Sequence, residues 1–344
     1  MFNINKKIGQ MFIIRMQGNI ITDELITLIK DYHVGGISLY SKNYNSYDEM
    51  QSLINNLKII NSKYNKIPLF IAIDEEGGRV DRLPKDFNNI PSAKKMAINN
   101  KVKETGDLIG ELLSDIGVNM NFAPVLDIQR FDDDHPIGNR CFGTNKEDVI
   151  NNGLSMVNSL KEKVVPVVKH FPGHGLVKRD SHFLLPVVRK DIEKTDDLLV
   201  FKEAINNDVP MIMVSHMIIS KIDKRYPASL SKKVIKKYIF EELNYKGLVI
   251  TDDLKMKPIK LLYGTKKATL KAIEAGNNIV LIGESYKTVM ECIDYVIGKI
   301  NDEIKENINN SYHKIVKIKK EYKINDELKE KINVEKYNRR ITKL

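Results

Sequence analysis

Eight short apolar runs recur along the chain, and a longer amphipathic stretch follows each of them. Near-continuous apolar runs are typical of strands buried on both faces of a parallel sheet, and amphipathic stretches are typical of the helices that cover it. Eight such units match the repeat count of a (β/α)8 barrel, although the count alone leaves an open doubly wound sheet as an alternative. The runs are residues 10–16, 35–40, 68–75, 117–127, 164–171, 210–217, 247–253 and 277–283.

Motifs of nucleotide-binding open sheets are missing from the chain. No G-x-G-x-x-G follows the first run, and no G-x-x-x-x-G-K-[ST] occurs anywhere. The segment 301–344 has helical spacing without a strand signal, and no linker rich in Pro, Ser or Gly divides the chain. We therefore expect one α/β domain over residues 1–344. It would be a single-domain (β/α)8 TIM-type barrel to about residue 300, followed by extra C-terminal helices and a tail.

Composition excludes several classes of protein. Hydrophobic residues make up 42% and charged residues 29%, which is typical of a folded globular chain. The net charge is +10, but no basic run is interleaved with aromatic residues, so we expect no nucleic-acid partner. No apolar stretch approaches the roughly 20 residues needed to span a bilayer. With only Cys141 and Cys292, no disulfide framework can form, and we expect a cytoplasmic protein without a membrane partner.

Ionisable and polar residues end five of the eight runs. The active site of a (β/α)8 barrel lies at the C-terminal ends of its strands, so these side chains are expected to meet at one face. Charged side chains at the ends of buried strands lose hydration, which is unfavourable for folding. A role in chemistry explains their presence better than a role in stability. These residues are Asp74, Glu75, Glu76, Asp127, Lys169, His170, Ser215, His216, Thr251, Asp252 and Asp253.

The segment 169–182 holds the densest group of such residues. Its three histidines and Asp180 raise the possibility of a metal site, but Pro172 and the neighbouring glycines forbid the helix of an H-E-x-x-H zinc motif, so we expect no metal. Asp180 and His182 lie two residues apart, so the carboxylate can fix the tautomer of an imidazole that serves as general acid and base. A solvated Asp-Ser-His turn is the simpler alternative.

Two adjacent carboxylates, Asp252 and Asp253, end the run 247–253. One can face the barrel axis and attack a substrate while its neighbour supports the local backbone. A carboxylate nucleophile with a separate acid/base is the arrangement of a retaining glycosidase. A helix N-cap is the alternative for Asp253.

Six blocks of the sequence, in order, resemble the β-N-acetylglucosaminidases of glycoside hydrolase family 3. They are DEEGGRVDR (74–82), GNRCFG (138–143), KHFPGHG with DSH (169–182), SHMIISKID (215–223), GLVITDDLKMK (247–257) and the terminal NNSYHKIVKIKKEYKI. The resemblance covers nearly the whole chain.

The resemblance implies a role for each matching position. Asp252 would be the nucleophile and His182 the acid/base, assisted by Asp180. The sugar would be held by Asp74, Arg82, Arg140, Lys169 and His170. The chain departs from the family pattern at Leu176 and Val177, where Asp-Thr usually follows GHG.

The function implied is an exo-acting retaining β-N-acetylglucosaminidase. It would remove terminal GlcNAc from muropeptides in cell-wall recycling, or from chitooligosaccharides, as a monomer without a cofactor. Three alternatives stay open at this point. They are a phosphorylase of the same family, in which phosphate replaces water, a sugar-binding homologue impaired in catalysis, and a metal-dependent barrel hydrolase.

Overall fold

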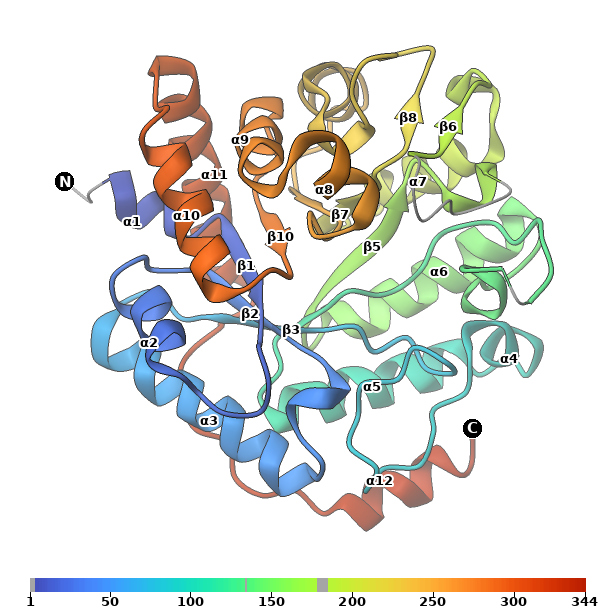
Figure 1. Cartoon of the computed structure of the whole chain (residues 1–344). Helices are drawn as coiled ribbons and strands as arrows, with labels where there is room; N and C mark the ends of the chain where they lie inside the picture. Colours follow the sequence, from blue (N-terminus) through green and yellow to red (C-terminus); the bar gives the residue numbers. More distant parts are fainter. Residues whose placement is uncertain (1–3, 134, 178–184) are drawn as a thin grey trace.

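A computed structural model describes residues 4–133, 135–177 and 185–344 (Figure 1). Within this part of the chain, eight parallel strands form one sheet in the order β10-β1-β2-β3-β4-β5-β7-β9. A bridge between Ile250 and Ile279 joins the two edges and closes the sheet into a barrel. The predicted (β/α)8 barrel is therefore confirmed. The strands are β1 Phe12–Arg15, β2 Gly36–Leu39, β3 Phe70–Ile73, β4 Met120–Asn121, β5 Val165–Phe171, β7 Met211–Val214, β9 Leu248–Thr251 and β10 Val280–Ile282.

Helices surround the barrel and connect its strands (Figure 1). Several begin where the side chain of Thr22, Ser46, Asn145 or Asn301 accepts a hydrogen bond from a backbone N–H of the first turn. Such caps satisfy donors that a helix start leaves unpaired. The α-helices are α1 Ile4–Gly9, α2 Asp23–Lys30, α3 Tyr47–Tyr64, α4 Ala93–Ile98, α5 Val102–Ile116, α6 Lys146–Lys161, α7 Asp196–Asn206, α8 Lys257–Tyr263, α9 Thr265–Ala275, α10 Tyr286–Ile297, α11 Asp302–Glu321 and α12 Val334–Ile341.

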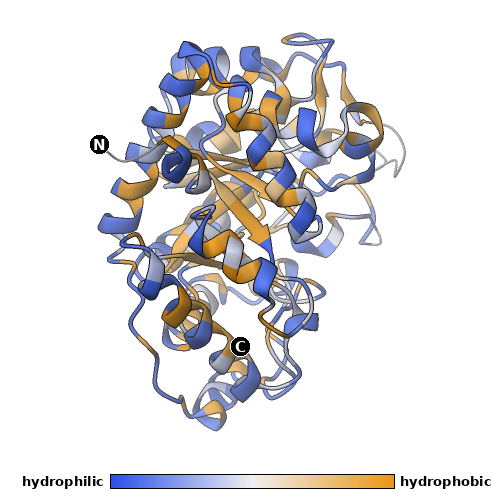
Figure 2. Ribbon diagram, turned by 60° about the vertical axis from the view of Figure 1, so that its left-hand side comes forward, coloured by the Kyte–Doolittle hydropathy of each residue, from blue (hydrophilic) through white to orange (hydrophobic). Residues whose placement is uncertain are grey.

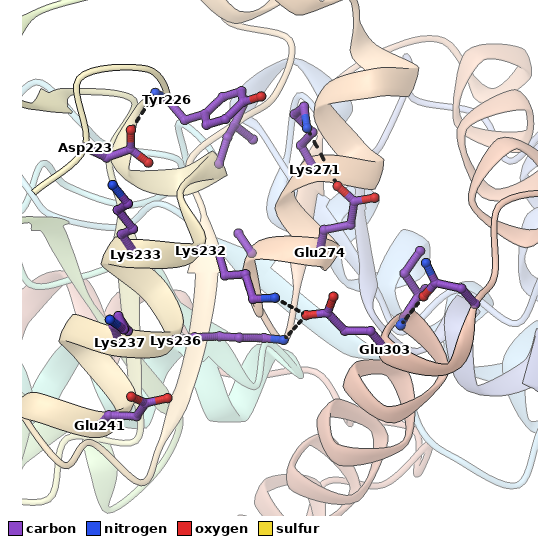
Figure 3. Close-up of a pocket in the computed structure, with 14 residues that line it drawn as sticks. Asp223, Tyr226, Lys232, Lys233, Lys236, Lys237, Glu241, Lys271, Glu274 and Glu303 are labelled. Atoms are coloured by element: carbon purple, nitrogen blue, oxygen red, sulfur yellow. Dashed lines mark hydrogen bonds and ion pairs between the residues drawn. The ribbon is translucent and has the colours of Figure 1, made fainter.

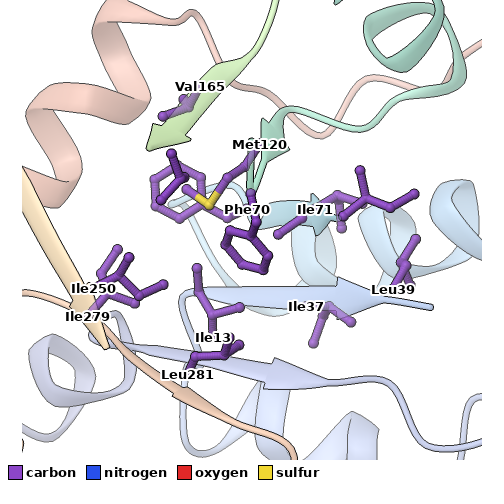
Figure 4. Close-up of a cluster of buried hydrophobic side chains, with 14 of the residues drawn as sticks. Ile13, Ile37, Leu39, Phe70, Ile71, Met120, Val165, Ile250, Ile279 and Leu281 are labelled. Carbon is purple, nitrogen blue, oxygen red and sulfur yellow. The ribbon is translucent and has the colours of Figure 1, made fainter. Parts of the chain in front are cut away.

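The core has an inner part inside the barrel and an outer part between strands and helices. Ile13, Phe70, Met120, Ile250 and Leu281 are among the buried side chains of the strands (Figure 4). A Cβ at Gly36 would come within 2.7 Å of the Cβ of Phe70, so only glycine fits that place in the inner layer. Apolar residues follow the strands, and hydrophilic ones lie on the outer helix faces (Figure 2).

Two features lie outside the regular repeat. A short pair of parallel strands, β6 Val187–Val188 and β8 Ile218–Ile219, follows β5 and β7 beyond the barrel rim. The helix after β7, Lys233–Glu242, is a π-helix. No described helix is long and apolar enough to cross a membrane.

The helices after residue 300 pack against the outside of the barrel (Figure 1). Lys319 of α11 is buried, and its Nζ donates to the carbonyl oxygens of Gly35 and Pro68 and to Oε1 of Gln10, near the N-terminal ends of β2 and β3. Helix α12 packs on α5, where the hydroxyl of Tyr337 lies 2.6 Å from Oδ2 of Asp115.

Candidate active site

Four of the eight residues predicted to act in catalysis or binding lie at the C-terminal ends of the barrel strands. Asp74 follows β3, Lys169 and His170 lie near the end of β5, and Asp252 follows β9. In the closed sheet, β3 and β9 are four strands apart, so Asp74 and Asp252 lie on opposite sides of the barrel mouth.

A buried network of charges joins three elements at this mouth. Nζ of Lys169 lies 2.7 Å from Oδ1 of Asp74 and 2.6 Å from Oε1 of Glu76. Glu76 also accepts from the guanidinium of Arg140, with Oε2 2.7 Å from Nε and Oε1 2.8 Å from the second terminal nitrogen. The structure therefore brings Asp74, Lys169 and Arg140 together, and Glu76 is the residue that links the two cations.

The protonation states in this network follow from its pairing. Burial acts to raise the pKa of Glu76, but Lys169 and Arg140 hold that pKa well below its usual value. Burial acts to lower the pKa of Lys169, and the carboxylates of Asp74 and Glu76 raise it above its usual value. The site is thus a set of paired ions around one buried ammonium.

The loop after β3 is shaped by its own buried carboxyl group. Oε2 of Glu75 accepts from the backbone N–H of Arg82 at 2.8 Å, and its Oε1 accepts from the N–H of Gly77. Gly77 has φ +77°, and a Cβ there would meet the carbonyl oxygen of Pro91 at 2.3 Å, so the turn requires glycine. Burial raises the pKa of Glu75 well above its usual value.

Arg82 reaches the mouth beside a tyrosine that follows β2. The guanidinium carbon of Arg82 lies 5.6 Å from the ring centroid of Tyr40. The guanidinium carbon of Arg15, the last residue of β1, lies 3.7 Å from the same centroid. Burial raises the pKa of Tyr40, and the charges of Asp74 and Asp253 raise it further. Arg82 therefore lies at the same face as the Lys169 network.

His170 is held by a carboxylate that is buried completely. Oδ2 of Asp127 lies 2.7 Å from Nδ1 of His170, and Oδ1 accepts from the backbone N–H of His174 at 2.7 Å. This contact fixes the ring and directs Nε2 away from Asp127. Although burial acts to raise the pKa of Asp127, His170 lowers it below its usual value.

The two carboxylates after β9 have different surroundings. Burial acts to raise the pKa of Asp252, but the charges of His216 and His170 hold it below its usual value. Asp253 instead supports the backbone: its Oδ1 accepts from the N–H groups of Lys255 at 2.9 Å and Gly283 at 2.8 Å. Burial raises the pKa of Asp253. The carboxyl group of Asp252 therefore has the lower pKa of the two.

Asp180 and His182, the predicted acid/base pair, lie outside the described residues. The preceding residues are described: a short 3-10 helix, His174–Leu176, follows β5. Val177 is buried in a hydrophobic cluster of the outer core, between the strands and the surrounding helices, and Leu176 packs against that cluster. The departure from the family pattern at these two positions thus places apolar side chains in the outer core.

A large cavity lies elsewhere, on the outside of the barrel. It has a volume of about 730 Å³ and lies between the π-helix Lys233–Glu242 and helices α9 and α11. Lys232 and Lys236 converge there on Glu303 (Figure 3). No strand end of the barrel lines it, so we do not assign the active site to this cavity. Among the described residues, no group of three or more His, Cys, Asp or Glu side chains is arranged to hold a metal ion.

An eight-stranded parallel barrel with paired carboxylates, lysine, arginine and histidine at its mouth has the architecture of a barrel enzyme. Residues 3–318 match the family described as glycosyl hydrolase family 3 N terminal domain. The chain belongs to this family and is a glycoside hydrolase.

Relatives and solved structures agree with this assignment. The chain is 30% identical over 277 residues to a β-hexosaminidase of Methylobacillus flagellatus, covering 77% of this chain and 78% of that protein. It is 29% identical over 293 residues to a β-hexosaminidase of Haemophilus influenzae, covering 82% of each. The structure of a glycoside hydrolase family 3 β-N-acetylglucosaminidase from Paenibacillus superposes with a TM-score of 0.91 at 29% identity, covering all of this chain and 68% of that one.

Proposed function

We propose that the protein is an exo-acting, retaining β-N-acetylglucosaminidase. The single observation that carries the mechanism is the ionised, histidine-flanked carboxylate of Asp252 at the end of β9, across the barrel mouth from Asp74. Relatives named β-hexosaminidase or β-N-acetylglucosaminidase over most of the chain support the choice of sugar.

In the proposed reaction, Asp252 attacks the anomeric carbon of the terminal sugar while protonated His182 gives its proton to the leaving oxygen. The bond from the anomeric carbon to that oxygen breaks, and a glycosyl-enzyme ester forms on Asp252. Neutral His182, held by Asp180, then takes a proton from water, which attacks the same carbon. The bond from that carbon to the oxygen of Asp252 breaks, which releases GlcNAc and restores the carboxylate. An imidazole in this role places no second anion beside Asp252.

The far side of the mouth is proposed to hold the sugar. Asp74 has an 18% exposed side chain and one oxygen already paired with Lys169, so it can accept from a sugar hydroxyl with the other. Lys169, His170, Arg82 and Arg140 supply donors around it. Hydrogen bonds from such preorganised groups can strengthen as charge develops in the transition state.

The natural substrate is proposed to be a small GlcNAc-containing muropeptide handled during cell-wall recycling in the cytoplasm, and the working form a monomer. Chitooligosaccharides are the second candidate substrate. Cys141 and Cys292 are both buried and free, which suits a reducing compartment.

The proposal is tested with 4-nitrophenyl β-N-acetylglucosaminide. Wild type should release free GlcNAc, identified by mass, at a rate that added phosphate does not change. GlcNAc-1-phosphate as the product would show a phosphorylase instead. No release by the folded wild-type protein would contradict the proposed activity.

A further inference from the structure

Arg15 points into the barrel at the top of its interior. Ile13 pairs in register with Gly36, and Gly36 pairs with Phe70, which forms one inward-facing layer. Side chains alternate along a strand, so the residues two places further on face inward one layer higher. Arg15 belongs to that layer, and it is the last residue of β1.

Arg15 forms a stack with two residues of the mouth. The guanidinium groups of Arg15 and Arg82 both lie over the ring of Tyr40, with their carbons 3.7 Å and 5.6 Å from the ring centroid. The flat ring fixes the plane of a guanidinium and leaves its edge free to donate hydrogen bonds. The stack lies near Asp74, whose charge acts on Tyr40.

Both guanidinium groups in the stack lack full pairing within the described chain. The Nε atoms of Arg15 and Arg82 are buried without a hydrogen-bond partner, and neither arginine forms an ion pair with a described carboxylate. Buried donors of this kind are rare in native proteins because they lose hydration without compensation. Arg140, in contrast, pairs with Glu76 through two of its nitrogens.

We propose that Arg15 is a further sugar-binding residue, which donates to a hydroxyl in the half of the terminal sugar remote from the scissile bond. This inference rests on the proposed function, because an anomeric carbon at Asp252 places the opposite end of the ring toward β3 and toward Tyr40, which follows the neighbouring strand β2. The charges of Asp74 and Asp253 also act on Tyr40, so the surroundings of the stack are not purely cationic. A neutral, hydroxyl-bearing ring therefore suits the stack as a ligand.

The test measures binding of free GlcNAc by calorimetry, so that it does not depend on turnover. The ligands are GlcNAc and its 3-, 4- and 6-deoxy analogues, and the proteins are wild type and Arg15→Met. We expect Arg15→Met to weaken GlcNAc binding about tenfold, the loss typical of a hydrogen bond from a charged donor. The penalty should vanish for the analogue that lacks the contacted hydroxyl, which a double-mutant cycle detects.

A matched control and a stability measurement separate binding from structure. Arg340 also stacks on a tyrosine, with its guanidinium carbon 5.5 Å from the ring centroid of Tyr337, but it lies on α12 far from the mouth. Arg340→Met should bind GlcNAc like wild type. Arg15→Met should melt no lower than wild type, because it removes an unpaired buried donor.

Two results would overturn the inference alone. Equal affinity of wild type and Arg15→Met for GlcNAc would show that Arg15 makes no contact with the sugar. An equal penalty for every analogue together with a lowered Tm would show a purely structural role. Failure of the proposed function would appear separately, as a wild-type protein that does not hydrolyse the glycoside. A wild-type protein that binds no GlcNAc would overturn both the proposed function and the role of Arg15.

Discussion

Replacing Glu76 by Gln removes the carboxylate that links the two buried cations of the candidate active site. Lys169 has a 2% exposed side chain and Arg140 a 16% exposed one, and Gln keeps the shape of Glu76 but not its charge. Lys169 would retain only Asp74, and Arg140 would lose both of its contacts with a carboxylate. Removing one partner of a buried ion pair lowers the free energy of unfolding by about 3–5 kcal/mol, because the remaining charge stays desolvated.

That loss converts into a measurable shift in melting temperature. An unfolding entropy of about 2.1 cal/mol/K per residue over 344 residues gives roughly 0.7 kcal/mol/K, so Glu76→Gln should lower Tm by about 4–7 °C. Calorimetry or circular dichroism at pH 7 measures it. Hydrolysis should fall as well, because Lys169 and Arg140 lose the group that positions them.

The outer surface supplies a matched control. Glu303 also pairs with two cations, Lys232 and Lys236, but its side chain is 48% exposed. Exposed pairs contribute about 0–1 kcal/mol, so Glu303→Gln should shift Tm by at most about 1–2 °C. Equal shifts for Glu76→Gln and Glu303→Gln, or an unchanged Tm in both, would refute the argument from burial.

The pH dependence of the difference has a defined sign. The pKa of Glu76 is lowered in the folded state, so the unfolded chain binds its proton first as the pH falls. The stability gap between wild type and Glu76→Gln should be constant above about pH 4.5, the ordinary value for Glu, and shrink as the pH falls below it. A gap that grows on acidification would contradict the assigned ionisation.

Three further outcomes follow. Asp252→Asn should lower kcat by at least about 1,000-fold with little change in Tm. Asp253→Asn should retain most activity, because it keeps the Oδ1 acceptor for two backbone N–H groups. Steady-state kinetics on both variants measure this, and the reverse order of losses would contradict the assignment. Asp127→Asn should raise KM and lower kcat/KM about tenfold, because it frees the ring of His170. An unchanged pH–rate profile and an unchanged KM would show that Asp127 does not orient that ring. Exhaustive chelation should leave the rate unchanged, and a loss restored by added metal would indicate the metal-dependent hydrolase instead.

The sequence predicted the barrel because its strands are buried on both faces and therefore read as apolar runs. It also predicted which residues end the strands. It did not predict the pairing among them: Asp74, Glu75 and Glu76 are adjacent acids, and only the structure shows that Glu76 pairs with Lys169 and Arg140 while Glu75 folds back on its own loop.

Other features were hidden for similar reasons. Arg15 interrupts the apolar run 10–16, as a solvent-facing residue would, and only the register with β2 places its side chain inside the barrel. The strands β6 and β8 are two residues long, too short to give a periodic signal. The predicted role of His182 with Asp180 stays a prediction, as does the single-domain organisation over 1–344.

The stereochemistry of the first-formed product tests the central claim most directly. Proton NMR can follow 4-nitrophenyl β-N-acetylglucosaminide from the first turnover, before the free sugar mutarotates. A retaining enzyme that forms an ester on Asp252 must release the β-anomer of GlcNAc first, and Asp252→Asn must release none at a comparable rate. Initial release of the α-anomer, or full activity of Asp252→Asn, would contradict the proposed mechanism.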